Sequence, residues 1–279
     1  MVHIITLMEN TPSENKALIN QHGLSFLIEA HGHKILFDCG QGDAFLYNAE
    51  KLGISLKHVD VVLLSHNHYD HAAGFQNFIN RGGSCGELIV GKDFFDKKYA
   101  SLDSIKYTDL SGGFSEQFLN DYHTQYRFCD RCVELYPGVY AFNDFERSHP
   151  IEKIPRRFVR MKPDGNCKPD DFHDEISLVI ETSKGMVVIV GCSHPGILNM
   201  LTSIRKKFQK PIYALFGGTH LMEADETRIE NSILEMKEMG LSVFGLCHCS
   251  GDQADACMAR HPELGFCHLS VGDNIFIDD

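Results

Sequence analysis

The chain has 279 residues, of which 43% are hydrophobic and 23% charged, and this is the composition of an ordinary globular protein. It contains no run of about 18 apolar residues, which excludes a transmembrane helix, and its formal net charge of −12 argues against nucleic-acid binding as a main role. Residues 1–8 lack the basic region and cleavage site of a signal peptide and are interpreted as a strand, so we expect a cytoplasmic protein.

The ten cysteines are scattered along the chain, and without a secretory signal we expect most of them to be reduced and packed in the core. Cys129 and Cys132 form one C-x-x-C pair. A structural zinc site needs a second such pair, which the sequence lacks, so a redox or metal role for this pair has weak support.

Several elements are predicted before the first motif. Residues 23–30 and 33–38 are typical of two strands of a hairpin, and residues 42–53 are typical of a helix with Asp43 as its N-cap. Residues 59–65 form a short apolar run that indicates a buried strand. Asp38, at the end of its strand, either orients a metal ligand or forms a turn, and the sequence favours neither.

Four potential metal ligands follow the 59–65 strand within six residues, namely His66, His68, Asp70 and His71. In an extended loop, His66 and His68 point the same way. Asp70 and His71 fall at the start of a short helix expected near 72–79, where backbone N–H groups favour a carboxylate. Imidazole and carboxylate ligands suit zinc, manganese or iron, so this loop predicts a metal site.

The same order of elements recurs later in the chain. A second hairpin is predicted and is followed by alternating helices and strands, at 176–182, 186–191, 196–208, 211–216, 225–240 and 243–247. His194, His220 and His248 each come just after one of these strands. Two similar halves indicate an α/β fold with two sheets packed face to face and helices outside, and ligands at strand ends can converge on one crevice.

The middle of the chain, residues 81–174, is rich in glycine, aspartate and aromatic residues. We expect it to be an elaborated insertion between the halves of a single domain that spans residues 1–279, and such excursions often cover a site. The acidic run at 170–175 re-enters the core. Its acidic residues either line the crevice or form a solvated loop. The solvated loop is favoured, because clusters of charged residues are usually exposed.

With these motifs the chain resembles the metallo-β-lactamase-fold superfamily, whose mark is an H-x-H-x-D-H loop after a strand. Five further segments resemble the branch that includes archaeal dihydropterin-methyl-aminobenzene ribofuranosyl phosphate synthases; they are 23–25, 36–40, 191–194, 217–221 and 247–251.

The resemblance implies a four-layer αββα sandwich with one or two divalent ions in its cleft. By it, the ligands of the first ion are His66, His68 and His194, and those of the second are Asp70, His71 and His248. The superfamily usually has a bridging Asp, and here His220 stands at the corresponding strand end. His220 then ligates one ion, contacts substrate, or leaves the second site weak.

The leading functional hypothesis is a metal-dependent hydrolase, in which a hydroxide held by the metal attacks an ester- or phosphoester-type bond. Asp70 and His220 are its candidate catalytic residues. The alternative is a transferase that joins a pterin diphosphate to an arylamine ribofuranosyl phosphate. A di-iron oxygen-reducing protein is disfavoured, since such relatives carry Glu where His68 stands. A protein that binds metal only to brace its fold is the remaining hypothesis.

Zinc is the expected metal, with manganese and iron as alternatives, because the ligand types suit all three. The expected partner is a small molecule, anionic or phosphorylated, and neither nucleic acid nor a membrane is expected. The sequence does not determine whether the protein forms a homo-oligomer.

Overall fold

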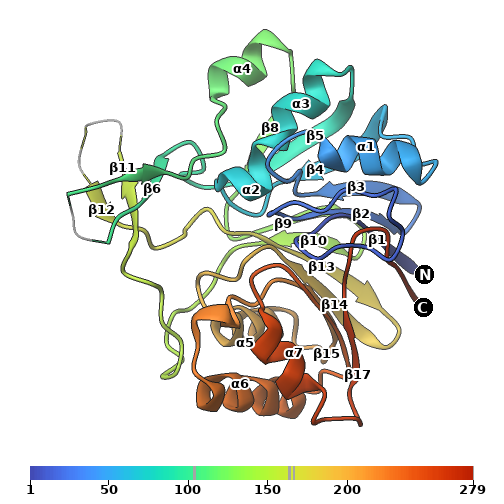
Figure 1. The fold of residues 1–279 in the computed structure, drawn as a ribbon, viewed down its shortest axis with the longest axis vertical. Coiled ribbons are helices and arrows are strands. Elements are labelled where there is room, and N and C mark those ends of the chain that lie inside the picture. The colour runs from blue at the N-terminus through green and yellow to red at the C-terminus, as the bar shows by residue number, and fades with distance from the viewer. Residues whose placement is uncertain (103–104, 163–164, 166, 279) are drawn as a thin grey trace.

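The computed structural model describes residues 1–278 apart from 103–104, 163–164 and 166. Its chain forms four layers, with helices, two sheets and further helices stacked in that order (Figure 1). This confirms the αββα sandwich that the sequence predicted.

Two seven-stranded sheets make the inner layers. The first has the order β18 (Asn274–Ile277), β1 (Val2–Met8), β2 (Ser25–Ala30), β3 (His33–Phe37), β4 (His58–Leu63), β5 (Ser84–Gly91) and β8 (Tyr126–Cys129). The second has the order β17 (Gly265–His268), β16 (Val243–Leu246), β15 (Ile212–Gly217), β14 (Gly185–Val190), β13 (Ser177–Thr182), β10 (Val139–Phe142) and β9 (Cys132–Tyr136).

Helices cover the outer faces of both sheets (Figure 1). Near the first sheet lie α1 (Ala44–Lys51), α2 (Tyr69–Ala72), α3 (Gly74–Asn80) and α4 (Glu116–Asp121). Near the second lie α5 (Ile197–Phe208), the 3-10 turn η1 (Leu221–Glu223), α6 (Glu226–Glu238) and α7 (Asp252–Met258). In the described part of the chain, no helix has both the length and the apolar character needed to cross a bilayer.

Three apolar clusters hold the layers together. One lies between the sheets and contains Phe26, Phe37 and Phe216, while the other two join each sheet to its own helices through residues such as Phe75 and Phe244. Burying a large apolar side chain contributes about 1.5–3 kcal/mol, so these clusters supply most of the driving force for the sandwich.

The two sheets repeat one topology. In the first, β2 and β3 are antiparallel and β3, β4 and β5 are parallel; in the second, β13 and β14 are antiparallel and β14, β15 and β16 are parallel. Parallel strands of one sheet end at a common edge, so the loops after β14, β15 and β16 lie together. The loop after β4 meets them from the first sheet, since the rings of His66 and His194 lie 4.7 Å apart. This edge carries the candidate ligands.

Residues 81–174 contribute to all three sheets. They supply β5 and β8 to the first sheet, β9 and β10 to the second, and all four strands of a third sheet. That third sheet, on the left of Figure 1, has the order β12 (Cys167–Pro169), β11 (Phe158–Met161), β6 (Lys97–Ala100) and β7 (Thr108–Asp109). The division of the chain into one domain with an 81–174 insertion stays a prediction.

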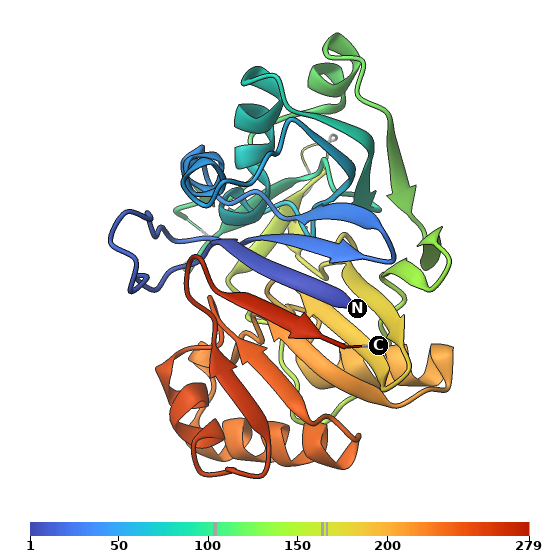
Figure 2. The same ribbon diagram turned by 90° about the vertical axis from the view of Figure 1, so that its right-hand side faces the viewer.

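Several details differ from expectation. Asp43 precedes α1 but makes no side-chain cap bond; it pairs with Arg81 instead. The sequence analysis did not predict α7, β17 or β18, whose short segments lack a clear periodicity. Strand β18 pairs with β1, which brings the two ends of the chain side by side (Figure 2).

Candidate metal centre

The loop after β4 is buried at the edge where the parallel strands end. His66, His68, Asp70 and His71 are each at most 6% exposed. Helix α2 begins at Tyr69, so Asp70 and His71 lie in its first turn as predicted. Leu24 N–H donates to the Asp70 carbonyl and Cys39 N–H to that of His71, which fixes the loop against the first sheet.

Three imidazoles form the first cluster of donors. The ring centroids of His66, His68 and His194 lie 4.6–5.0 Å apart. The Nε2 atoms of His66 and His68 are buried and have no hydrogen-bond partner among the described residues. Buried polar atoms are seldom left unpaired, so a ligand between these rings is the physical explanation.

Three other donor atoms form a second cluster beside the first. His71 Nε2 lies 3.1 Å from His248 Nε2, and Asp70 Oδ2 lies 3.8 and 3.5 Å from these two nitrogens. Donor atoms around a tetrahedral zinc ion with bonds of about 2.0–2.2 Å are separated by roughly 3.3–3.6 Å. The donor types and their spacing therefore fit a divalent ion.

Four of the histidines are held through Nδ1, which leaves Nε2 to face the cluster. The Nδ1 partners are Ser65 Oγ at 2.9 Å for His66, Asp38 Oδ2 at 2.6 Å for His71, Glu175 Oε2 at 2.9 Å for His194, and Asn10 Oδ1 at 3.0 Å for His248. Such partners fix the ring orientation of ligating histidines. Of the two roles considered for Asp38, the structure supports the orienting one.

Burial and nearby charges set the protonation of the cluster. Burial lowers the pKa of His68 to about 3 and that of His66 and His194 well below its usual value. These rings are thus neutral, the form that binds metal. Burial alone would raise the pKa of Asp70, but His71 and His22 outweigh it and lower that pKa, so Asp70 is a carboxylate.

The acidic run at 170–175 is buried, contrary to the expectation of a solvated loop. Asp170 and Asp174 accept hydrogen bonds from Lys98 Nζ at 2.8 and 2.7 Å, and all three side chains are almost fully buried. The neighbouring Glu175 accepts bonds from the backbone and ring of His194. Opposite charge and N–H donors explain why these acids leave water.

His220 lies at the end of β15, and the fold brings it to the same edge. Its ring centroid is 4.7 Å from that of His194, and both of its ring nitrogens are buried without a hydrogen-bond partner among the described residues. Its φ of +52° is uncommon for a residue other than glycine. Its donor atom lies within 4.8 Å of those of Cys192 and Cys249, and its Nε2 is 3.7 Å from Glu223 Oε1.

Sequence reasoning missed several residues at this edge. His22 Nε2 lies 2.9 Å from Asp70 Oδ2 with a half-exposed ring, and no sequence signal pointed to it. Phe172 stacks on His194 with centroids 4.0 Å apart and planes 2° apart. Cys192 was detectable, because its C-x-H spacing to His194 repeats the H-x-H spacing of His66 and His68.

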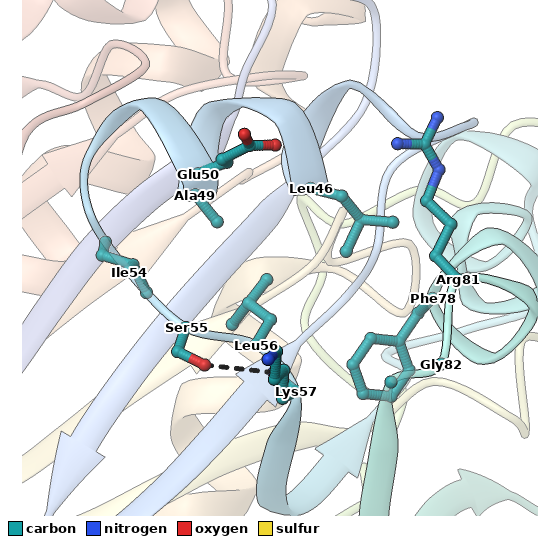
Figure 3. Close-up of a pocket in the computed structure, with 11 residues that line it drawn as sticks. Leu46, Ala49, Glu50, Ile54, Ser55, Leu56, Lys57, Phe78, Arg81 and Gly82 are labelled. Atoms are coloured by element: carbon teal, nitrogen blue, oxygen red, sulfur yellow. Dashed lines mark hydrogen bonds between the residues drawn. The ribbon is translucent and has the colours of Figure 1, made fainter.

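Other candidates lie elsewhere. The Cys129 thiol is buried and donates a hydrogen bond to the Ala141 carbonyl, and burial raises its pKa to about 12. Ser193 precedes His194, and the two residues could be drawn as a nucleophile and its base, but Ser193 Oγ donates to the Gly218 carbonyl instead. The hollow in Figure 3 lies between α1 and the turn after α3, and its lining residues include none of the predicted ligands.

Comparison with known proteins identifies the family of the chain. Residues 20–123 match the family model of the metallo-beta-lactamase superfamily. The chain is 30% identical over 279 residues to the 7,8-dihydropterin-6-methyl-4-(beta-D-ribofuranosyl)-aminobenzene-5'-phosphate synthase of Methanocaldococcus jannaschii, covering 97% of this chain and 95% of the relative.

Two further similarities concern hydrolytic enzymes. A solved metal-dependent hydrolase of the beta-lactamase superfamily is 30% identical, with a TM-score of 0.85 and full coverage of both chains. Ribonuclease Z of Clostridium botulinum is 31% identical over 78 residues, which cover 26% of this chain and 24% of the relative.

Proposed function

This chain belongs to the metallo-beta-lactamase superfamily, and we propose that it is a metal-dependent hydrolase that cleaves an ester- or phosphoester-type bond of a small anionic substrate. In the proposal, His66, His68 and His194 hold one divalent ion, and Asp70, His71 and His248 hold a second. Zinc is the proposed metal, with manganese and iron as alternatives. The observation that carries the proposal is the pair of adjacent donor clusters whose Nε2 atoms face a common space.

A divalent ion acts as a Lewis acid and lowers the pKa of the water it holds. The protein's own part is to place and orient groups. Asp70 is kept as a carboxylate between His71 and His248, where it both ligates and directs the attacking water. His220, at the wall beside His194, contacts the substrate or adds a ligand.

A cation beside the clusters supports an anionic substrate. The Arg157 guanidinium lies 4.4 Å from the centroid of Phe158, and the Phe158 ring lies within 6.1 Å of those of His68, His194 and His220. Arg157 pairs with Glu223 and is partly exposed. In a protein with a net charge of −12, such a local cation can attract phosphate or carboxylate.

The test uses the purified wild-type protein and two histidine variants. We expect the wild type to contain divalent metal and to hydrolyse at least one member of a phosphodiester, thioester and lactone panel, whereas His68→Ala loses both properties. His58→Ala is the control, because His58 lies on β4 with its ring at the surface bonded to Ser84. If His68→Ala loses the metal but keeps its activity, the proposal is wrong.

The second candidate is a transferase that joins a pterin diphosphate to an arylamine ribofuranosyl phosphate. The full-length similarity to the archaeal synthase favours it. Here divalent ions held by the same donors would bind the departing pyrophosphate. Turnover of a pterin diphosphate with an arylamine, together with no turnover of the hydrolase panel, would replace the first candidate by this one.

The remaining expectations are part of the proposal. The partner is a small molecule rather than nucleic acid or a membrane, in keeping with the net charge of −12, and the proposed compartment is the cytoplasm. A homo-oligomer is compatible with it.

A further inference from the structure

One sulfur atom lies at the middle of the donor clusters. Cys192 Sγ is within 4.8 Å of donor atoms of six other residues, which form three groups with it: His66 and His194, His71 and His248, and His220 and Cys249. Its separation from His71 Nε2 is 3.1 Å. Cys192 is 4% exposed, so the sulfur faces these donors rather than water.

The surrounding backbone is shaped to admit sulfur. Cys249 Sγ accepts the His220 backbone N–H at 3.3 Å and lies 3.4 Å from the Cys192 carbonyl oxygen. A Cβ on Gly218 would stand 2.6 Å from Cys249 Sγ, so only glycine leaves room there. The loops after β14, β15 and β16 thus each present one donor to the group of Cys192, His220 and Cys249, and two of these three donors are thiols.

The third member of this group is His220, whose Nε2 lies 3.7 Å from Glu223 Oε1, beyond hydrogen-bond distance. Both ring nitrogens of His220 are buried without a hydrogen-bond partner among the described residues, and its backbone is held at a φ of +52°. A strained backbone and unpaired buried nitrogens persist only where the surroundings favour them. A metal site on this side of the cluster accounts for both.

We propose that the Cys192 thiolate is itself a ligand of the metal centre, shared between the His66–His194 pair and the His71–His248 pair. The centre is then a mixed nitrogen–sulfur site. Thiolate is a soft ligand that suits zinc, cobalt or iron and is unsuited to magnesium. The inference rests on the proposed function only in requiring that these histidines bind metal.

The first experiment loads the metal-free protein with Co²⁺ and records its absorption spectrum. A thiolate ligand gives an intense sulfur-to-cobalt charge-transfer band in the near ultraviolet, beside the weaker visible bands of the ion. We expect the wild type to show this band, and Cys192→Ala to bind cobalt but lose it. Cys247→Ala is the matched control, since Cys247 is buried two residues before Cys249 but packs in the core between the sheets.

The second experiment needs no variant. X-ray absorption of the zinc-loaded wild type should show a zinc–sulfur distance near 2.3 Å in addition to nitrogen or oxygen at about 2.0–2.2 Å. Circular dichroism and thermal unfolding establish whether Cys192→Ala folds; if it does not, this measurement decides alone.

Three results would overturn the inference. Metal bound with nitrogen and oxygen neighbours alone refutes the sulfur ligand and leaves the proposed function intact. If Cys249→Ala loses the charge-transfer band and Cys192→Ala keeps it, the ligand is Cys249 rather than Cys192. Failure of the wild type to bind cobalt or zinc at all removes the proposed function as well.

Discussion

The two halves of the molecule deliver metal donors in different ways. The first half places four candidate ligands in one loop after β4, whereas the second half places one histidine after each of β14, β15 and β16. A single loop fixes the spacing of its donors by local geometry. Donors on three separate strands depend on the register of the whole sheet.

Buried carboxylates compensate for this difference. Asp174 accepts the Asn67 N–H of the first loop at 2.9 Å, and the next residue, Glu175, accepts the backbone and ring of His194. Glu9, at the end of β1, accepts the His248 N–H at 2.7 Å. The separation between the loop after β4 and His194 is thus set by one short segment that touches both halves.

The largest effect is expected from removing the charge that holds this segment in place. Lys98→Met leaves Asp170 and Asp174 buried without their cation, which costs about 3–5 kcal/mol in the free energy of unfolding. Urea denaturation of the metal-free protein measures it. Lys97→Met is the control: that side chain is 59% exposed and 3.8 Å from Asp109, so it should cost less than about 1 kcal/mol. Equal effects of the two variants would contradict the role given to Lys98.

A smaller effect is expected from the carboxylates that orient one histidine in each half. Asp38→Asn weakens the support of His71 and Glu175→Gln that of His194, and each should lower metal affinity about 10–100-fold. Competition with a chelator measures the affinities. Asp60→Asn, at the surface of β4, should leave them unchanged. A loss in one variant alone would show that the halves do not contribute equally.

The smallest effect is expected at His268, which pairs with Glu9, the carboxylate that accepts the His248 backbone N–H. Hydrogen bonds to Asp255 and Glu9 raise the pKa of His268 to about 10. A raised folded-state pKa stabilises the protein fully below the unfolded value of about 6.5, and the contribution disappears as the pH rises through 10. The stability difference between the wild type and His268→Gln should therefore be larger at pH 6 than at pH 10 in urea denaturation. A difference that stays constant over this range would exclude the ion pairs.

The parts of the site that could be predicted from sequence are those with local signals. The H-x-H-x-D-H spacing and the histidines after apolar runs identified the loop and the strand ends. The sequence identified Asp38 as a candidate but could not decide between an orienting role and a turn, because its partner His71 is 33 residues away. The fold class followed from the repeated order of strands and helices.

Other residues carry no such signal, since their role depends on which segments meet. The composition of 170–175 favours solvent, and only the fold reveals that Lys98 lies opposite Asp170 and Asp174. Phe172 is the same case: its φ of +49° and its stacking on His194 follow from the segment's path across the site. Asp43 shows the reverse, a local cap signal overridden by a partner 38 residues away.

The pairing of β18 with β1 has a consequence for the order of events in synthesis. The donors run from His66 to His248, and the strand that carries Glu9 and Asn10 at its end pairs with a strand made after all of them. A growing chain can form the first loop early, but it holds an incomplete set of ligands until His248 has left the ribosome. Contacts between residues as far apart in the sequence as Glu9 and His248 form slowly. If the proposed ligands bind metal, uptake by the complete site is therefore a late step, which follows chain synthesis rather than guiding it.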